Sequence, residues 1–150
     1  MSGPVEGPTP STRFQLLRRL AADEVGELWV GRDTTLGERV FLRLGHAGQP
    51  WSGNLRDAMR KAFVQARRLH HRGVLRLLDF HPDDPTPAIS MEPAPEESLS
   101  AWRGRPTSDW LPVLARVAES VAEAHHQGVV HRALTPERVF LESGSRPRVW

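Results

Sequence analysis

The sequence contains no cysteine, and only one of its 20 basic residues, Lys61, is a lysine. The absence of cysteine excludes disulfides, thiol catalysis and cysteine-ligated metal sites, and it fits the reducing cytoplasm, where we expect the protein to be located. No apolar run is long enough to cross a bilayer, so we expect no membrane span in this chain. Any chemistry must therefore come from other residue types.

The charge pattern argues against a nucleic-acid partner. The formal net charge is only +2, although the isoelectric point is about 10.3. Arginine holds its proton far above neutrality, so a small excess of arginine moves the isoelectric point a long way. Basic and acidic residues are interspersed and form no basic stripe, so we expect no nucleic-acid binding.

Length and composition indicate a globular domain. The 150 residues suffice for a real core, and 39% of them are apolar while 25% are charged, as in ordinary soluble proteins. Residues 1–12 are rich in proline and glycine and carry no basic-then-apolar signal pattern. We therefore expect a disordered N-terminal segment at 1–12.

Hydrophobic spacing predicts the order of the elements. Apolar runs bounded by turn residues predict strands at 14–20, 27–32, 38–44, 74–80 and 87–92, and short ones at 129–130, 139–141 and 148–150. Helical spacing predicts a helix from an Asn54 cap to Gly73, a brief one at 98–102, and a long one from Trp110 to Gly128 whose core face includes Leu111 and Leu114. Strands followed mostly by helix predict an α+β arrangement in two lobes.

One stretch carries the most specific motif. Residues 131–139 read His-Arg-Ala-Leu-Thr-Pro-Glu-Arg-Val, after Ala-His-His-Gln-Gly-Val-Val at 124–130. Ser90-Met91-Glu92, residues 28–33 and residues 36–40 supply further motifs in a fixed order. Together these segments resemble the first half of a bacterial-type serine/threonine protein kinase domain, over about residues 14–150.

The resemblance implies a protein kinase-like α+β fold. Its N-lobe, at 13–92, would be a five-stranded antiparallel sheet with one helix. A hinge at 93–97 would lead to a partial, mainly helical C-lobe at 98–150.

The family's catalytic-loop residues are replaced in this sequence. The aspartate that orients the substrate hydroxyl is Ala133, the lysine that steadies the phosphate is Thr135, and the asparagine that binds Mg²⁺ is Arg138. A methyl group accepts no proton, and a cation repels the metal. We therefore expect no catalytic residue and no metal site.

The N-lobe motifs have changed as well. Arg43 stands for the strand lysine, and Gln65 for the helix glutamate that would pair with it, so the resemblance implies no ion pair between them. In the glycine-rich loop only Gly26 is kept, and Asp23 is expected to repel phosphate oxygens. Phe41 replaces a small residue that lies over adenine in the family.

These losses predict a pseudokinase, a catalytically inactive domain that acts in signalling through a protein partner or self-association. The alternative is an atypical serine/threonine kinase or ATP-binding switch with weak or no phosphotransfer. A further alternative is a degenerate, truncated gene product or one module of a longer protein. If the 150 residues are the whole protein, we expect an exposed apolar patch, self-association or an obligate partner. No cofactor is expected. In the ATP-binding alternative, the nucleotide pocket would be formed by Gly26, Phe41, Arg43, Met91, Glu92 and Ala94.

Several residues have a structural and a functional interpretation. We interpret His131 as a packing and hydrogen-bonding residue, and Trp102 and Trp110 as core. The adjacent histidines at 70–71 and 125–126 are poor chelates, because neighbouring helical side chains diverge by about 100°. Gly26 fits a turn glycine nearly as well as a phosphate-loop glycine, and the sequence leaves both interpretations open.

Overall fold

The computed structural model describes residues 10–49, 51–143 and 145–150. They form two compact units. The first contains the chain up to Val64 together with Leu77–Pro93, and the second contains Gln65–Arg76 together with Ala94–Trp150. This division places residues 65–76 with the second unit, whereas the sequence placed them in the first lobe. Most of the predicted segment 1–12 lies outside the described residues.

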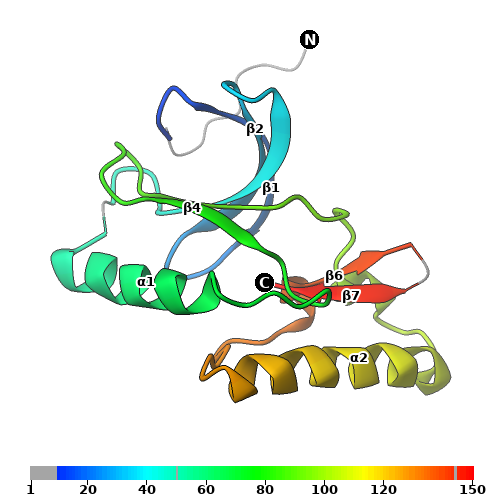
Figure 1. The fold of residues 1–150 in the computed structure, drawn as a ribbon. Coiled ribbons are helices and arrows are strands. Elements are labelled where there is room, and N and C mark those ends of the chain that lie inside the picture. Colours follow the sequence, from blue (N-terminus) through cyan, green and yellow to red (C-terminus); the bar gives the residue numbers. More distant parts are fainter. Residues whose placement is uncertain (1–9, 50, 144) are drawn as a thin grey trace, which may run out of the picture. The chain divides into compact units, whose positions relative to one another are not determined.

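The first unit is built on a five-stranded antiparallel sheet (Figure 1), in the strand order β1-β2-β3-β5-β4. Its strands are β1 (Phe14–Ala22), β2 (Glu27–Asp33), β3 (Glu38–Leu44), β4 (Leu77–His81) and β5 (Ala88–Met91). The predicted five-stranded sheet with one helix is therefore confirmed.

The register of the central strands divides their side chains between two faces. Phe41 on β3 lies opposite Val30 on β2 and Met91 on β5. Residues directly opposite one another point to the same side of a sheet. The other side carries an apolar core made of Phe14, Trp29, Val40, Leu42, Leu44 and Ala88.

Asp33 closes the β2–β3 hairpin and ties it to the start of β1. Its side chain is buried, and Oδ1 accepts hydrogen bonds from the N–H groups of Thr35 at 2.9 Å and Leu36 at 3.2 Å. Oδ2 accepts a bond from Arg13 Nε at 2.8 Å. This bond with Arg13 lowers the pKa of the Asp33 carboxyl, although burial opposes it. The pair therefore links the β2–β3 hairpin to the residue that precedes β1.

Helix α1 (Gly53–Ala66) differs at both ends from the prediction. Ser52 Oγ accepts a hydrogen bond from Leu55 N at 3.3 Å, and the Ser52 carbonyl accepts one from Arg56 N at 2.8 Å, so Ser52 and not Asn54 caps the helix. The helix ends at Ala66 and not at Gly73, because tight turns follow it. Its one buried residue, Phe63, stacks on Phe80 of β4 with ring centroids 5.5 Å apart.

The second unit contains η1 (Leu99–Trp102), α2 (Thr107–His126), η2 (Pro136–Arg138), β6 (Val139–Glu142) and β7 (Arg146–Val149). Strands β6 and β7 pair as an antiparallel hairpin. The predicted strand at 129–130 is wrong, because Val129 N donates to the Ala124 carbonyl at 2.9 Å and closes the end of α2.

Residues 73–75 also belong to this unit, so the prediction of a strand starting at 74 is wrong. Gly73 O accepts a bond from Val149 N at 2.8 Å, and Leu75 N donates to Val149 O at 2.8 Å. Val74 thus forms a parallel bridge with Val149 of β7, while β4 starts only at Leu77. The backbone hydrogen bonds of Gly73 O and Leu75 N are made with β7, whereas the run from Leu77 onward pairs with β5 in the five-stranded sheet.

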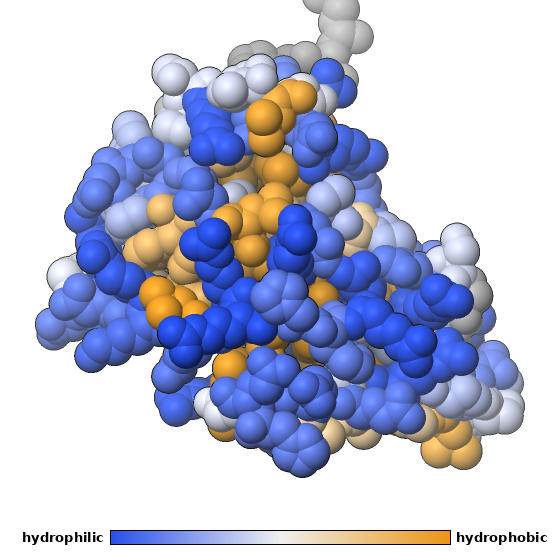
Figure 2. All heavy atoms as spheres, viewed as in Figure 1, coloured by the Kyte–Doolittle hydropathy of each residue, from blue (hydrophilic) through white to orange (hydrophobic). Residues whose placement is uncertain are grey.

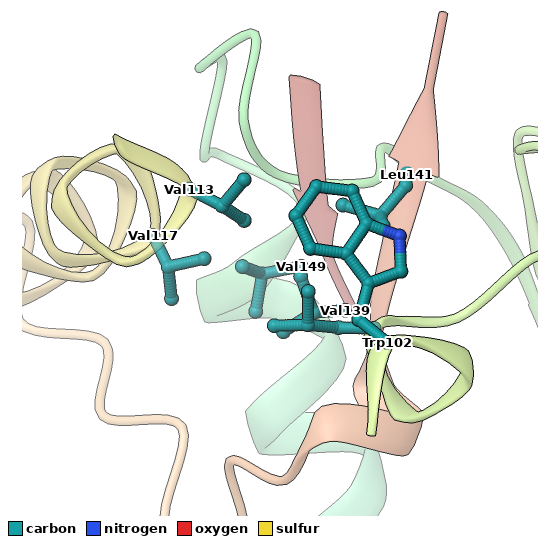
Figure 3. Packing of buried hydrophobic residues seen from close by; sticks show 7 residues of the cluster. Trp102, Val113, Val117, Val139, Leu141 and Val149 are labelled. Atoms are coloured by element: carbon teal, nitrogen blue, oxygen red, sulfur yellow. The ribbon is translucent and has the colours of Figure 1, made fainter. Parts of the chain in front are cut away.

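The core of the second unit joins η1, α2 and the hairpin (Figure 3). Its buried members are Leu99, Trp102, Val113, Val117, Val139, Leu141 and Val149. Trp102 meets Trp110 edge to face, with ring centroids 6.4 Å apart. The core interpretation is therefore confirmed for Trp102, whereas Trp110 is only partly buried and packs against the same cluster.

The predicted core face of α2 is only partly right. Val113, Val117 and Ser120 are buried, but Leu111 is 61% exposed and Leu114 is 46% exposed. The helix carries apolar residues on more than one side, so spacing alone could not choose which side packs.

Candidate functional site

One set of predicted site residues lies in the first unit, at the turn between β1 and β2 and at the end of β3. Asp23 N donates to the Gly26 carbonyl at 2.9 Å, which closes the hairpin. The Asp23 carboxylate folds back over the turn, where Oδ1 accepts bonds from Val25 N at 2.9 Å and Gly26 N at 3.2 Å. This is an aspartate turn, in which the side chain replaces backbone partners.

Arg43 pairs with the same carboxylate oxygen. Its guanidinium Nη2 donates to Asp23 Oδ1, and the Arg43 side chain is only 9% exposed while that of Asp23 is 29% exposed. From the sequence, Asp23 was expected only to repel phosphate oxygens. The antiparallel pairing of β1, β2 and β3 brings it beside Arg43, 20 residues away in the chain.

His46 and Glu27 hold the turn from the other side. His46 Nε2 lies 2.7 Å from the Asp23 carbonyl oxygen, and His46 Nδ1 lies 3.6 Å from Glu27 Oε1. Glu27 also accepts a bond from Trp29 Nε1 at 2.8 Å. Asp23 is therefore fixed through its N–H, its carbonyl and its carboxylate. No signal in the sequence pointed to His46.

Gly26 has a packing reason that involves no phosphate. A Cβ atom at this position would lie 1.9 Å from the carbonyl oxygen of Leu44 and 3.2 Å from the Cα atom of Gly45. Both are backbone atoms at the end of β3. This approach supports the turn interpretation that the sequence left open beside the phosphate-loop interpretation.

Phe41 and Met91 occupy the sheet face that, by resemblance, would meet adenine. They are cross-strand partners, and Phe41 is 1% exposed while Met91 is 2% exposed. Such burial leaves almost none of the phenyl surface accessible. Glu92 and Ala94, whose backbone groups would hold adenine at the hinge, are both partly exposed.

Gln65, which stands at the position of the family's helix glutamate, lies in the last turn of α1 with an exposed side chain. The cation at position 43 has an acidic partner nonetheless, because Asp23 supplies the charge that Gln65 lacks.

A separate set of predicted site residues lies in the loop at 131–138 of the second unit. Ala133 and Thr135 are exposed, and Thr135 precedes η2 without a side-chain capping bond. Arg138, at the end of η2, places its guanidinium 5.2 Å from the centre of the Trp150 ring. Arg132 has a φ of 63°, in the left-handed region that costs a residue with a side chain about 1 kcal/mol.

His131 holds this loop from within. Ala133 N donates to His131 Nδ1 at 3.2 Å, and His131 Nε2 lies 2.6 Å from the Trp150 carbonyl oxygen. A neutral ring with its proton on Nε2 satisfies both contacts. Burial lowers the pKa of His131, the Trp150 carbonyl opposes that shift, and the Arg138 charge adds to it. The interpretation of His131 as a hydrogen-bonding residue is confirmed.

The described residues contain no group of three or more histidine or acidic side chains that could hold a metal ion. Within the same residues, no helix has the length and apolar character that crossing a membrane requires.

Comparison with known proteins found relatives that are all protein kinases. No protein-family model matches the chain. It is 29% identical over 140 residues to the serine/threonine-protein kinase Pkn1 of Myxococcus xanthus, covering 91% of this chain and 20% of the relative. It is 30% identical over 152 residues to the DNA damage-responsive serine/threonine-protein kinase RqkA of Deinococcus radiodurans, covering 94% and 22%. The chain thus spans about a fifth of the length of these relatives.

Solved structures show the same fold. The crystal structure of the Mycobacterium tuberculosis PknI kinase domain superimposes with a TM-score of 0.73 at 21% identity, over 99% of this chain and 61% of that one. A double mutant of that domain gives a TM-score of 0.77 over 97% of this chain. The chain is therefore similar in sequence to bacterial serine/threonine protein kinases, and it has the fold of their kinase domain from the N-lobe through the beginning of the C-lobe.

Proposed function

We propose that this chain is a catalytically inactive, cytoplasmic protein kinase-like domain that acts in signalling through protein contacts. The observation that carries the proposal is Ala133, which stands at the catalytic-loop aspartate position of a recognisable motif. Thr135 and Arg138 remove two further groups from the same loop. Phosphoryl transfer depends on positioning and charge neutralisation, so these replacements remove what the loop would contribute.

The proposed inactivity can be tested with a chimeric kinase domain. Residues 131–139 of this chain, placed in the full kinase domain of an active bacterial relative, are expected to lower phosphate transfer from radiolabelled ATP at least about a thousandfold. Losing one electrostatic group of this kind often costs about 3–4 kcal/mol of barrier, and three are exchanged here. Initial rates with Mg²⁺ and with Mn²⁺ measure the effect.

The matched control is a chimera that receives residues 124–130, which keep the family's pattern, and it should retain activity. A 131–139 chimera that transfers phosphate at the relative's rate would refute the proposal. So would metal-dependent transfer by the chain itself that Arg43→Ala abolishes.

The second part, a role in protein contacts, is supported by the exposed leucines of α2. Leu111 and Leu114 lie three residues apart, and Figure 2 shows apolar side chains exposed at the lower edge of the molecule, over the beginning of α2. Ala115 and Ala118 beside them are exposed too. A contiguous exposed apolar patch of this kind typically marks an interaction surface.

We expect the chain to self-associate through this patch. The double substitution Leu111→Ser and Leu114→Ser should weaken association at least about tenfold, since burying a leucine is worth about 1.5–3 kcal/mol. Light scattering across a concentration series measures the effect. Leu36→Ser is the control, because Leu36 is 63% exposed in the β2–β3 turn of the first unit. A stable monomer that binds no hydrophobic dye would contradict this part.

A further inference from the structure

Three hydrogen-bond donors converge on one oxygen atom in the β1–β2 turn. The N–H groups of Val25 and Gly26 and the guanidinium of Arg43 all point at Asp23 Oδ1. Two backbone N–H groups in a tight turn beside a cation form an anion site, because both supply fixed positive charge. The anion that fills this site is a side chain of the same turn.

Strand β3 and contacts around the turn hold the residues of this site. Arg43 lies on the central strand β3, and its side chain is 9% exposed. Gly26 is held against the end of β3, where a Cβ atom would meet the Leu44 carbonyl. His46 Nε2 lies 2.7 Å from the Asp23 carbonyl oxygen and so contacts the main chain of Asp23. Contacts other than those of the Asp23 carboxylate thus hold the main chain of Gly26 and Asp23, and β3 carries Arg43.

We infer that Asp23 is an internal competitor, a carboxylate that occupies a phosphate-binding site and excludes inorganic or nucleotide phosphate from it. The inference deepens the proposed function and rests on it, because it assigns the loss of phosphate binding to one removable side chain. A phosphate group would need the same N–H groups and the same guanidinium, and the carboxylate would repel it.

The inference predicts a gain of binding when the carboxylate is removed. Asp23→Gly should bind inorganic pyrophosphate, in buffer without magnesium, at least about tenfold more tightly than the unchanged chain, as expected for charged hydrogen bonds that become available. Isothermal titration calorimetry and the rise in melting temperature with pyrophosphate measure it. Adenosine, which has no phosphate, should bind no variant more tightly than it binds the unchanged chain.

Two matched variants show where the binding arises. Glu24→Gln removes the same charge from an exposed neighbour in the turn and should leave pyrophosphate binding unchanged. Arg43→Gln, added to Asp23→Gly, should abolish the gain. If Asp23→Gly folds but binds no more tightly than Glu24→Gln, or if the gain survives Arg43→Gln, the inference is wrong.

If Asp23→Gly does not fold, Asp23→Asn provides the test. Asparagine can still accept bonds from Val25 and Gly26, so it preserves the turn while removing the charge that faces Arg43. A gain of pyrophosphate binding, smaller than that expected for glycine, supports the inference. If this variant also fails to fold or gains no binding, Asp23 is a structural partner only and the inference is rejected.

These results separate the inference from the proposed function. The binding assay contains no metal and no transfer step, so its failure leaves the proposed inactivity in place. Phosphate transfer by the unchanged chain would refute the proposed function, whatever the variants bind.

Discussion

Replacing Trp102 with alanine is expected to lower the free energy of unfolding of the second unit by about 3–5 kcal/mol. Trp102 is 6% exposed and joins η1 to α2 and the β6–β7 hairpin (Figure 3). Its ring also meets Trp110 edge to face and lies 4.4 Å from the guanidinium carbon of Arg105. Removing the indole would leave a cavity where these three elements meet.

Urea denaturation followed by circular dichroism measures the loss, and hydrogen exchange shows which unit opens. Trp102→Phe is the matched control, because it keeps an aromatic ring and should cost less. The protection of Trp29 and Leu42 in the first unit should change little. A loss below about 1 kcal/mol for Trp102→Ala would mean that the cluster does not hold this unit together.

Replacing Gly26 with alanine is expected to cost about 3 kcal/mol, because the added methyl group meets backbone and not a movable side chain. The Cβ atom would lie 1.9 Å from the Leu44 carbonyl oxygen, so β2 and β3 would have to separate where they begin to pair. Thermal and urea unfolding measure the cost.

Gly53→Ala is the matched control for this substitution. No atom lies within 4 Å of a Cβ at position 53, at the first residue of α1. Alanine there should be neutral or should stabilise by up to about 1 kcal/mol, since it restricts the unfolded chain. If Gly26→Ala and Gly53→Ala behave alike, the packing interpretation of Gly26 fails and its role as a phosphate-loop glycine regains weight.

The order and type of the elements could be predicted because they depend on local signals. The alternating strands, the helical spacing of α2 and the motif at 131–139 all lie within short stretches of chain. The replacements at Ala133, Thr135 and Arg138 could be read directly, since each is a change of residue type at a known place in a motif. The sequence by itself therefore determined the fold class and supplied the residue replacements on which the proposed inactivity rests.

The tertiary structure decided which partners these residues have. The apolar sides of α2 could not be ranked until β6 and β7 packed against Val113 and Val117. Residues 74 and 75 looked like the start of a strand of the sheet, but their backbone pairs with Val149, which lies about half the chain away. In both cases the contact depends on long-range packing that no local pattern encodes.

The pairing of Asp23 with Arg43 shows the same division at the site. The sequence identified a carboxylate in the loop and an arginine on the strand, and treated them as two separate losses. Antiparallel register sets them side by side, so that the cation and the turn N–H groups all serve one internal anion. The residue types at positions 23 and 43 are specified by the sequence alone. Strand register decides that these two side chains meet, because opposite charges attract strongly only at the short distances that folding creates.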